Sequence, residues 1–157
     1  MSQTIRQRLV ELNLELPAAA KSVANYLPVM ASGSLVLTSG QLPLADGKLI
    51  ATGLLGRDLD VAAGALAARQ CALNILAQAE ANLGSLERIA KIVKITVFVA
   101  STADFTEQHL VANGASDLLV GAFGEKGKHA RSAVGVAALP MNAPVEIEAI
   151  LEIAQEP

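Results

Sequence analysis

Apolar positions change their spacing several times along the chain, and each spacing predicts a different element. Ile5, Leu9 and Leu12 recur at helical spacing among charged residues, which predicts a short amphipathic helix at the start of the chain. We expect Leu16-Pro17 to end this helix, because the residue before a proline is steered away from helical angles. A turn of hairpin composition, Ser32-Gly33-Ser34, then joins two predicted strands. These strands cover Tyr26 to Ala31 and Leu35 to Thr38.

A longer helical pattern occupies the middle of the chain. Asp60 is a good N-cap and Gly84 a natural stop, so a helix is predicted from about Asp60 to Leu83. A turn at Asp46-Gly47-Lys48 precedes it and allows one further short strand. Small alanines in this helix permit close packing on a sheet, and four leucines fall on one stripe: Leu66, Leu73, Leu76 and Leu83.

The second half of the chain reads as strand, helix, strand, strand. Ile89 to Val99 is rich in β-branched residues and predicts a central strand, followed by a helix from about Thr106 to Gly121. The polar loop Gly124 to Arg131 leads into the apolar segment Ser132 to Pro140, and Pro144 to Ile153 predicts the last strand. Strands outnumber helices and pair as hairpins at both ends, which favours the α+β class over a doubly wound parallel sheet.

The composition is unusually apolar for one small domain. The 157 residues are 52% hydrophobic and 17% charged, with a mean hydropathy of +0.44. Either a membrane segment or an oligomer could account for this, but the most apolar run contains Arg69, Gln70, Gln78 and Glu80, so an oligomer is favoured. A net charge of −3 and 3% aromatic residues argue against a nucleic-acid partner.

Cysteine use and the N-terminus bear on the compartment. Cys71 is the only cysteine, so no internal disulfide can form, and a reducing compartment is expected. It lies among alanines and leucines, where a small buried hydrophobe is the better interpretation than a catalytic thiol. The segment Met1 to Arg8 lacks the apolar core of a signal peptide, so we expect a cytoplasmic protein without a membrane partner.

Four short segments give the chain a family resemblance. They are Thr38-Ser39-Gly40-Gln41-Leu42-Pro43, Val93 to Val99 before Asp104-Phe105, Ala130-Arg131-Ser132, and Val145 to Ile150. In this order and at these intervals they resemble the Rid family, the reactive intermediate deaminases of YjgF type, often labelled L-PSP endoribonucleases. The similarity covers roughly Pro17 to Ala154. We expect a single domain of residues 1–157 in which residues 1–16 add an N-terminal helix to this region.

The resemblance implies a fold, an assembly and a reaction. The fold would be chorismate-mutase-like α+β, with two helices on one face of a mixed sheet, assembled as a homotrimer with three clefts between subunits. The reaction would be hydrolysis of reactive enamines and imines, such as 2-aminoacrylate and 2-iminopropionate, to 2-oxo acids and ammonia. No metal or organic cofactor is implied. A trimer would also bury apolar sheet surface.

Site residues follow from the same match. Arg131 falls on the family's carboxylate-binding arginine, and a planar guanidinium can hold a carboxylate through two hydrogen bonds. Glu146 falls on the glutamate that contacts substrate or water, where a carboxylate can handle a proton. The remaining cleft positions are Tyr26, Ser39, Asn113 and the backbone at Ala133. The family commonly has proline at the position of His129 and cysteine at that of Ala133, which indicates a divergent branch.

Several residues and functions have plainer interpretations. Glu148 and Glu152 alternate with apolar residues and are predicted to be the solvated face of a half-buried strand. His129, in a loop with lysines, is predicted to be solvated and is left out of the site. The alternative to a deaminase is a trimeric protein that binds a small carboxylate without turnover. Ribonuclease activity is opposed by the acidic balance, and chorismate mutase activity by the lack of a second nearby arginine.

Overall fold

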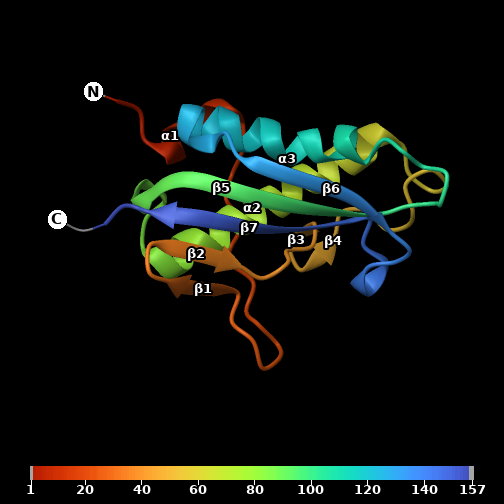
Figure 1. The fold of residues 1–157 in the computed structure, drawn as a ribbon, viewed down its shortest axis with the longest axis horizontal. Helices are drawn as coiled ribbons and strands as arrows, with labels where there is room; N and C mark the ends of the chain where they lie inside the picture. The colour runs from red at the N-terminus through yellow and green to blue at the C-terminus, as the bar shows by residue number, and fades with distance from the viewer. Residues whose placement is uncertain (1, 156–157) are drawn as a thin grey trace.

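A five-stranded mixed sheet with helices on one face is the frame of the protein, in a computed structural model that describes residues 2–155 (Figure 1). The strand order is β1-β2-β7-β5-β6, in which β5 and β6 are parallel and every other pair is antiparallel. This confirms the predicted α+β class. The strands are β1 (Val29–Ser32), β2 (Leu35–Thr38), β5 (Ile89–Ala100), β6 (Ala130–Val136) and β7 (Val145–Ile153).

The helices and a small hairpin complete the chain. The helices are α1 (Ile5–Glu11), α2 (Val61–Leu83) and α3 (Gln108–Phe123), and the hairpin pairs β3 (Leu44–Ala45) with β4 (Lys48–Leu49). Asp46 and Gly47 both have positive φ, at 52° and 76°, which is what a two-residue hairpin turn of the common mirror-image type requires. The turn predicted there is confirmed. It joins two short strands, β3 and β4, where one short strand was predicted.

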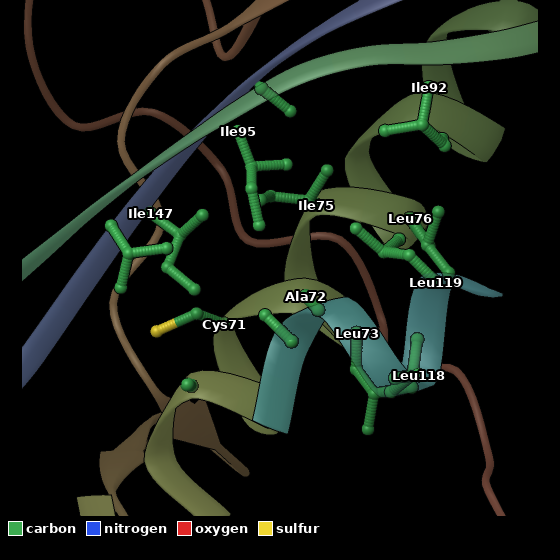
Figure 2. Packing of buried hydrophobic residues seen from close by; sticks show 14 of the residues in the cluster. Cys71, Ala72, Leu73, Ile75, Leu76, Ile92, Ile95, Leu118, Leu119 and Ile147 are labelled. Atoms are coloured by element: carbon green, nitrogen blue, oxygen red, sulfur yellow. The ribbon is translucent and has the colours of Figure 1, made fainter. Parts of the chain in front are cut away.

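The sheet has one covered and one open face. Along β5 and β7, alternate residues such as Ile95, Val97 and Ile147 are fully buried against α2 and α3. Figure 2 shows Ile95 and Ile147 close to Cys71 and Ile75 of α2, with Leu118 and Leu119 of α3 nearby. The opposite face is not covered by any described part of the chain. It carries large apolar side chains that are 41% to 53% exposed: Met30, Leu35, Leu37 and Val134.

The long helix α2 begins and ends where predicted. The Asp60 side chain accepts a hydrogen bond from the Ala63 backbone N–H, and Gly84 ends the helix in a left-handed conformation with φ of 85°. The predicted leucine stripe is wrong in one member, because Leu66 is 52% exposed. The buried face is instead built largely from alanines, whose small side chains let α3 approach closely: the Cβ of an alanine at Gly114 would lie 2.0 Å from the Ala65 carbonyl oxygen.

Four predicted boundaries are corrected. α1 ends at Glu11 and not at Leu16, because Asn13, with φ of 56°, turns the chain out of the helix well before the proline. The first strand begins at Val29, because Tyr26 lies in a bend. α3 runs two residues later than predicted, from Gln108 to Phe123. β6 begins at Ala130, two residues earlier than predicted, so Arg131 belongs to the strand and not to the loop before it.

The N-terminal helix is joined to the rest of the molecule by specific contacts. Thr4 and Gln7 form a capping box at its start, and Ile5 and Leu9 are buried in the core. The Ile5 backbone N–H also donates to Glu87 Oε1 at 2.6 Å. None of the helices in residues 2–155 combines the length and the apolar character needed to cross a bilayer.

Candidate functional site

Arg131 lies on the edge strand β6 and turns its side chain toward α3. It pairs in register with the buried Ile95 of β5, and register partners in a sheet present their side chains on the same face, which here is the helix-covered one. Its Nη1 donates to Asn113 Oδ1 at 2.9 Å and to Ser116 Oγ at 3.1 Å, and its Nη2 donates to the His109 carbonyl at 3.2 Å. The structure thus brings Asn113, a predicted site residue, against Arg131.

All three acceptors on Arg131 are neutral oxygens. Within residues 2–155 the arginine ion pairs are Arg6 with Glu80 and Arg57 with Asp58, and Arg131 has no carboxylate partner. The three contacts account for both Nη1 protons and one Nη2 proton of the five that a guanidinium carries. The protons left over, on Nε and Nη2, belong to the two nitrogens that can form a bidentate fork for a carboxylate. The positive charge is therefore uncompensated among the described residues, and Nε and one Nη2 proton have no partner there.

The neighbours of Arg131 include His129, which the sequence analysis left out of the site. His129 Nε2 lies 2.9 Å from Ser116 Oγ, and His129 Nδ1 lies 2.6 Å from the Gly127 carbonyl oxygen. The prediction that His129 is simply solvated is wrong, because its ring is part-buried and both nitrogens have partners. Sequence reasoning also missed Ser116. The available signal was its helical spacing of three residues from Asn113, which places both on one face of α3.

Glu146 projects from the other face of the sheet. It pairs with Phe98 of β5, which is of opposite alternation to Ile95, so Glu146 and Arg131 lie on opposite faces. Partial burial, and then the nearby charge of Glu148, raise the pKa of Glu146. Its carboxylate lies over Gly40, where the Cβ of an alanine would be 2.1 Å from Glu146 Oε1. Gly40 thus leaves the space that the carboxylate occupies.

Tyr26 and Ser39 meet at the base of a projecting loop, residues 17–28, which Figure 1 shows extending away from the strands at the bottom of the view. The Ser39 hydroxyl donates to the Leu27 carbonyl at 2.6 Å, and the Ser39 N–H donates to the Pro28 carbonyl at 2.9 Å. Ser39 therefore ties this loop to the sheet. Tyr26, next to Leu27, is 54% exposed, so its ring is open to solvent or to another molecule.

The predicted site residues form two separate groups in one chain. One group, here called the glutamate half-site, consists of Tyr26, Ser39, Gly40 and Glu146 near β1, β2 and the start of β7. The other, here called the arginine half-site, consists of Asn113, Arg131 and Ala133 on α3 and the opposite edge strand β6. Strand spacing and residue rise place the Cα atoms of Arg131 and Glu146 roughly 14 Å apart. A three- or four-carbon acid cannot contact both within one chain.

Two residues on the covered face complete the description. Ala133 is half-buried against the core, and its backbone lies on an edge strand, where part of the N–H and C=O groups face away from β5. Cys71 is fully buried, and burial raises the pKa of its thiol well above the ordinary value. Its Sγ is 3.6 Å from the Val145 carbonyl. The interpretation of Cys71 as a small buried hydrophobe fits this environment.

Comparison with known proteins identifies the family. A family described as "YjgF/chorismate_mutase-like, putative endoribonuclease" matches residues 6–152, which includes most of α1. The chain belongs to this family. Protein TCP17 of Trypanosoma cruzi is 48% identical over 153 residues, covering 97% of this chain and 96% of the relative. The resemblance seen in the sequence is confirmed.

Two further relatives bear on the fold and on the activity, respectively. The crystal structure of Atu1372 from Agrobacterium tumefaciens, a protein of unknown function, is 54% identical, covers 96% of this chain and 92% of that one, and superposes with a TM-score of 0.91. The 2-iminobutanoate/2-iminopropanoate deaminase of Salmonella typhimurium is 34% identical over 132 residues, covering 84% of this chain and 90% of the enzyme. A Rid-type role is supported, while the more similar of these relatives carry no named activity.

Proposed function

We propose that the protein hydrolyses small 2-imino acids to 2-oxo acids and ammonia, at clefts where two protomers of a homotrimer meet. The observation that carries this proposal is the guanidinium of Arg131, which is held by three neutral oxygens and has no carboxylate partner in residues 2–155. The similarity to an imine deaminase supports the choice of substrate class.

Arg131 would bind the substrate carboxylate through its Nε–H and its remaining Nη2–H. Fixing the acid in this way places the C=N carbon at a defined point near the β6 edge, so that rate is gained by orientation. The backbone around Ala133 lies on the same edge and would contact the imine nitrogen. Arg131 could not do this if a carboxylate of the same chain already neutralised it, and none does among the described residues.

The water and proton chemistry would come from the glutamate half-site of a second protomer. Because Arg131 and Glu146 lie on opposite faces of one sheet, only two copies of the chain can present both to one small acid. The exposed apolar residues of the open face, including Leu35 and Leu37, give such copies a surface to bury. Tyr26, on the projecting loop of that second protomer, would close the cleft.

The reaction balances without any cofactor. Water, held by Glu146, adds its oxygen to the C=N carbon, and its proton passes through the carboxylate to the nitrogen. The carboxylate then takes the hydroxyl proton of the tetrahedral carbinolamine and passes it to the amine nitrogen. The C=O bond forms as the C–N bond breaks, ammonia leaves and the 2-oxo acid remains. The raised pKa of Glu146 brings the carboxyl group closer to the pH at which it can both accept and return a proton.

A coupled assay tests turnover directly. A dehydratase generates 2-iminobutanoate, and the release of 2-oxobutanoate is timed in buffer, with wild-type protein and with Arg131→Ala. We expect wild type to accelerate release and Arg131→Ala to match buffer. Equal rates in all three samples would refute the deaminase.

Mixed trimers test the composite cleft. Arg131→Ala and Glu146→Ala are each expected to be inactive, but a trimer containing both regains one intact cleft of three. Random mixing after joint refolding should therefore restore about a quarter of wild-type activity, by the symmetry of a closed trimer. No recovery in verified mixed trimers would place both residues in the cleft of a single chain.

A non-catalytic carboxylate-binding trimer is the second candidate. It is favoured by Ala133, which stands where the family commonly has a cysteine. If wild type binds 2-oxobutanoate in an Arg131-dependent manner yet leaves the rate of imine hydrolysis at that of buffer, this second function holds. Ribonuclease activity, which the family description names, is tested by RNA cleavage, and cleavage that persists in Arg131→Ala would come from another site or a contaminant.

A further inference from the structure

We propose that His129 is a positioning residue that acts through Ser116 to hold Arg131 in its carboxylate-binding orientation. This inference rests on the proposed role of Arg131 and adds two residues to it. It begins from three contacts that form a continuous chain: the Gly127 carbonyl with His129 Nδ1, His129 Nε2 with Ser116 Oγ, and Ser116 Oγ with Arg131 Nη1.

With a neutral imidazole at His129, the chain fixes the direction of every proton in it. A carbonyl oxygen only accepts, so at 2.6 Å the Nδ1 of His129 must carry the proton that Gly127 receives. In the neutral imidazole Nε2 is then an acceptor, and Ser116 donates its hydroxyl proton to it. Arg131 Nη1 only donates, so it donates to a lone pair of Ser116 Oγ. Each group has one consistent role, and the Gly127 carbonyl selects the tautomer.

The consequence for Arg131 is loss of freedom. A serine in a helix can otherwise bond to the carbonyl four residues earlier, here that of Ala112, and turn its oxygen away from other partners. His129 removes this option by taking the hydroxyl proton, so the Ser116 oxygen stays directed at Nη1. With Asn113 on the second Nη1 proton and the His109 carbonyl on Nη2, Nε has no hydrogen-bond partner among the described residues.

The position of His129 in the fold is what allows the contact. The residue two positions before the arginine is commonly a proline in the resembling family, which has no side-chain donor or acceptor. The extended backbone of β6 starts at Ala130, and alternation along the chain puts residues 129 and 131 on the same side, facing α3. A histidine at this point, and a serine three residues after Asn113 on α3, are both needed for the contact.

The experiment measures Arg131 itself as well as ligand binding. Rotation of the Arg131 guanidinium about Nε–Cζ is followed by nitrogen and carbon NMR in wild type, His129→Ala, Ser116→Ala and the double variant. The affinity for 2-oxobutanoate is measured by calorimetry on the same four proteins. Lys128→Ala is the matched control, because Lys128 is adjacent to His129 but its side chain is paired with Glu125 at 2.7 Å.

We expect each single variant to speed the rotation several-fold and to weaken 2-oxobutanoate binding about fivefold, the size of one net hydrogen bond. The double variant should be no worse than Ser116→Ala alone, because His129 acts only through Ser116. Lys128→Ala should match wild type. Additive losses, or unchanged rotation in His129→Ala, would overturn the proposal.

Failure of this inference can be told from failure of the proposed function. If wild type binds 2-oxobutanoate through Arg131 but His129→Ala binds it equally well, His129 has no positioning role and the function stands. If wild type does not bind the acid at all, while the rotation of Arg131 still responds to His129→Ala and Ser116→Ala, the positioning is supported and the proposed function fails.

Discussion

Replacing Gly40 by alanine would test how the Glu146 carboxylate is placed. An added Cβ would lie 2.1 Å from Glu146 Oε1, 2.9 Å from its Cδ and 3.1 Å from its Cγ, and these are its three nearest atoms. No carboxylate can remain at these distances. Gly40 does not have a positive φ, so its backbone accepts alanine without strain. The substitution therefore acts on Glu146 alone.

The expected effect has opposite signs in two backgrounds. In the wild-type chain Glu146 must leave its preferred side-chain conformation, which costs about 1 kcal/mol in the free energy of unfolding. In a Glu146→Ala background there is no clash, and the stiffer unfolded chain should make Gly40→Ala stabilising by about 0.4–1 kcal/mol. The coupling energy between the two positions is then roughly 1.5–2 kcal/mol.

Urea unfolding of the four proteins measures this cycle, at a pH where the carboxylate is ionised and at matched protein concentration. Imine hydrolysis in Gly40→Ala should fall toward the level of Glu146→Ala, although the glutamate is still present. If Gly40→Ala changes stability equally in both backgrounds, the carboxylate does not rest on Gly40 in solution, and the placement of the glutamate half-site is wrong.

Three further predictions concern packing and ionisation. Gly114→Ala should lower the free energy of unfolding, measured in urea, by at least about 3 kcal/mol, because its Cβ would meet the backbone of Ala65. Gly84→Ala has open space around its Cβ but a φ of 85°, and it should lower the free energy of unfolding by about 1 kcal/mol. Cys71 should react with iodoacetamide only as fast as the protein unfolds, because burial raises the pKa of the thiol; fast labelling of folded protein would contradict this. Glu146→Gln should be more stable than wild type at pH 8 and equal to it in acid. The reason is that the raised pKa of Glu146 makes the stability of wild type fall as pH rises through that pKa. The test is the midpoint of urea unfolding of both proteins across a pH series.

Elements with strong local signals were predictable from the sequence. Asp60 and Gly84 bound α2 because a side-chain cap and a left-handed glycine are local chemistry that tertiary structure does not override. The β-branched run that begins at Ile89 is the long strand β5, an interior strand that lies between β7 and the edge strand β6. The Asp46-Gly47 turn followed equally from the backbone freedom of its residues.

Elements that depend on distant contacts were not predictable. Leu66 has helical spacing with Leu73 and Leu76, but α3 packs so closely at Gly114 that alanines occupy the buried face. α1 ends early because Asn13 adopts a left-handed conformation, and no apolar pattern records that turn. Tyr26 has strand propensity, yet the chain bends there as it leaves the projecting loop.

For the candidate site, the sequence identified residues but not their grouping. Alternation along each strand shows that Glu146 and Arg131 lie on opposite faces only when the register of β6 and β7 against β5 is known. That register is a property of the folded sheet and not of the local sequence. The same limit applied to His129. Nothing local distinguishes a solvated loop histidine from one that faces a helix, because its partner Ser116 is supplied by α3.

The separation into two half-sites bears on why the arginine can stay uncompensated. A chain that placed Glu146 beside Arg131 would form an ion pair that a substrate carboxylate must break. Holding Arg131 with neutral oxygens from Asn113, Ser116 and the backbone avoids that competition while keeping the side chain oriented. In the proposed composite cleft, the glutamate would be brought by a second copy to the water and not to the guanidinium. Under the proposed function, the opposite-face placement keeps Glu146 from pairing with Arg131 in the same chain. A variant that moves a carboxylate into contact with Arg131, such as Ser116→Asp, should then bind 2-oxobutanoate at least tenfold more weakly than Ser116→Ala, even though it adds a partner for the arginine.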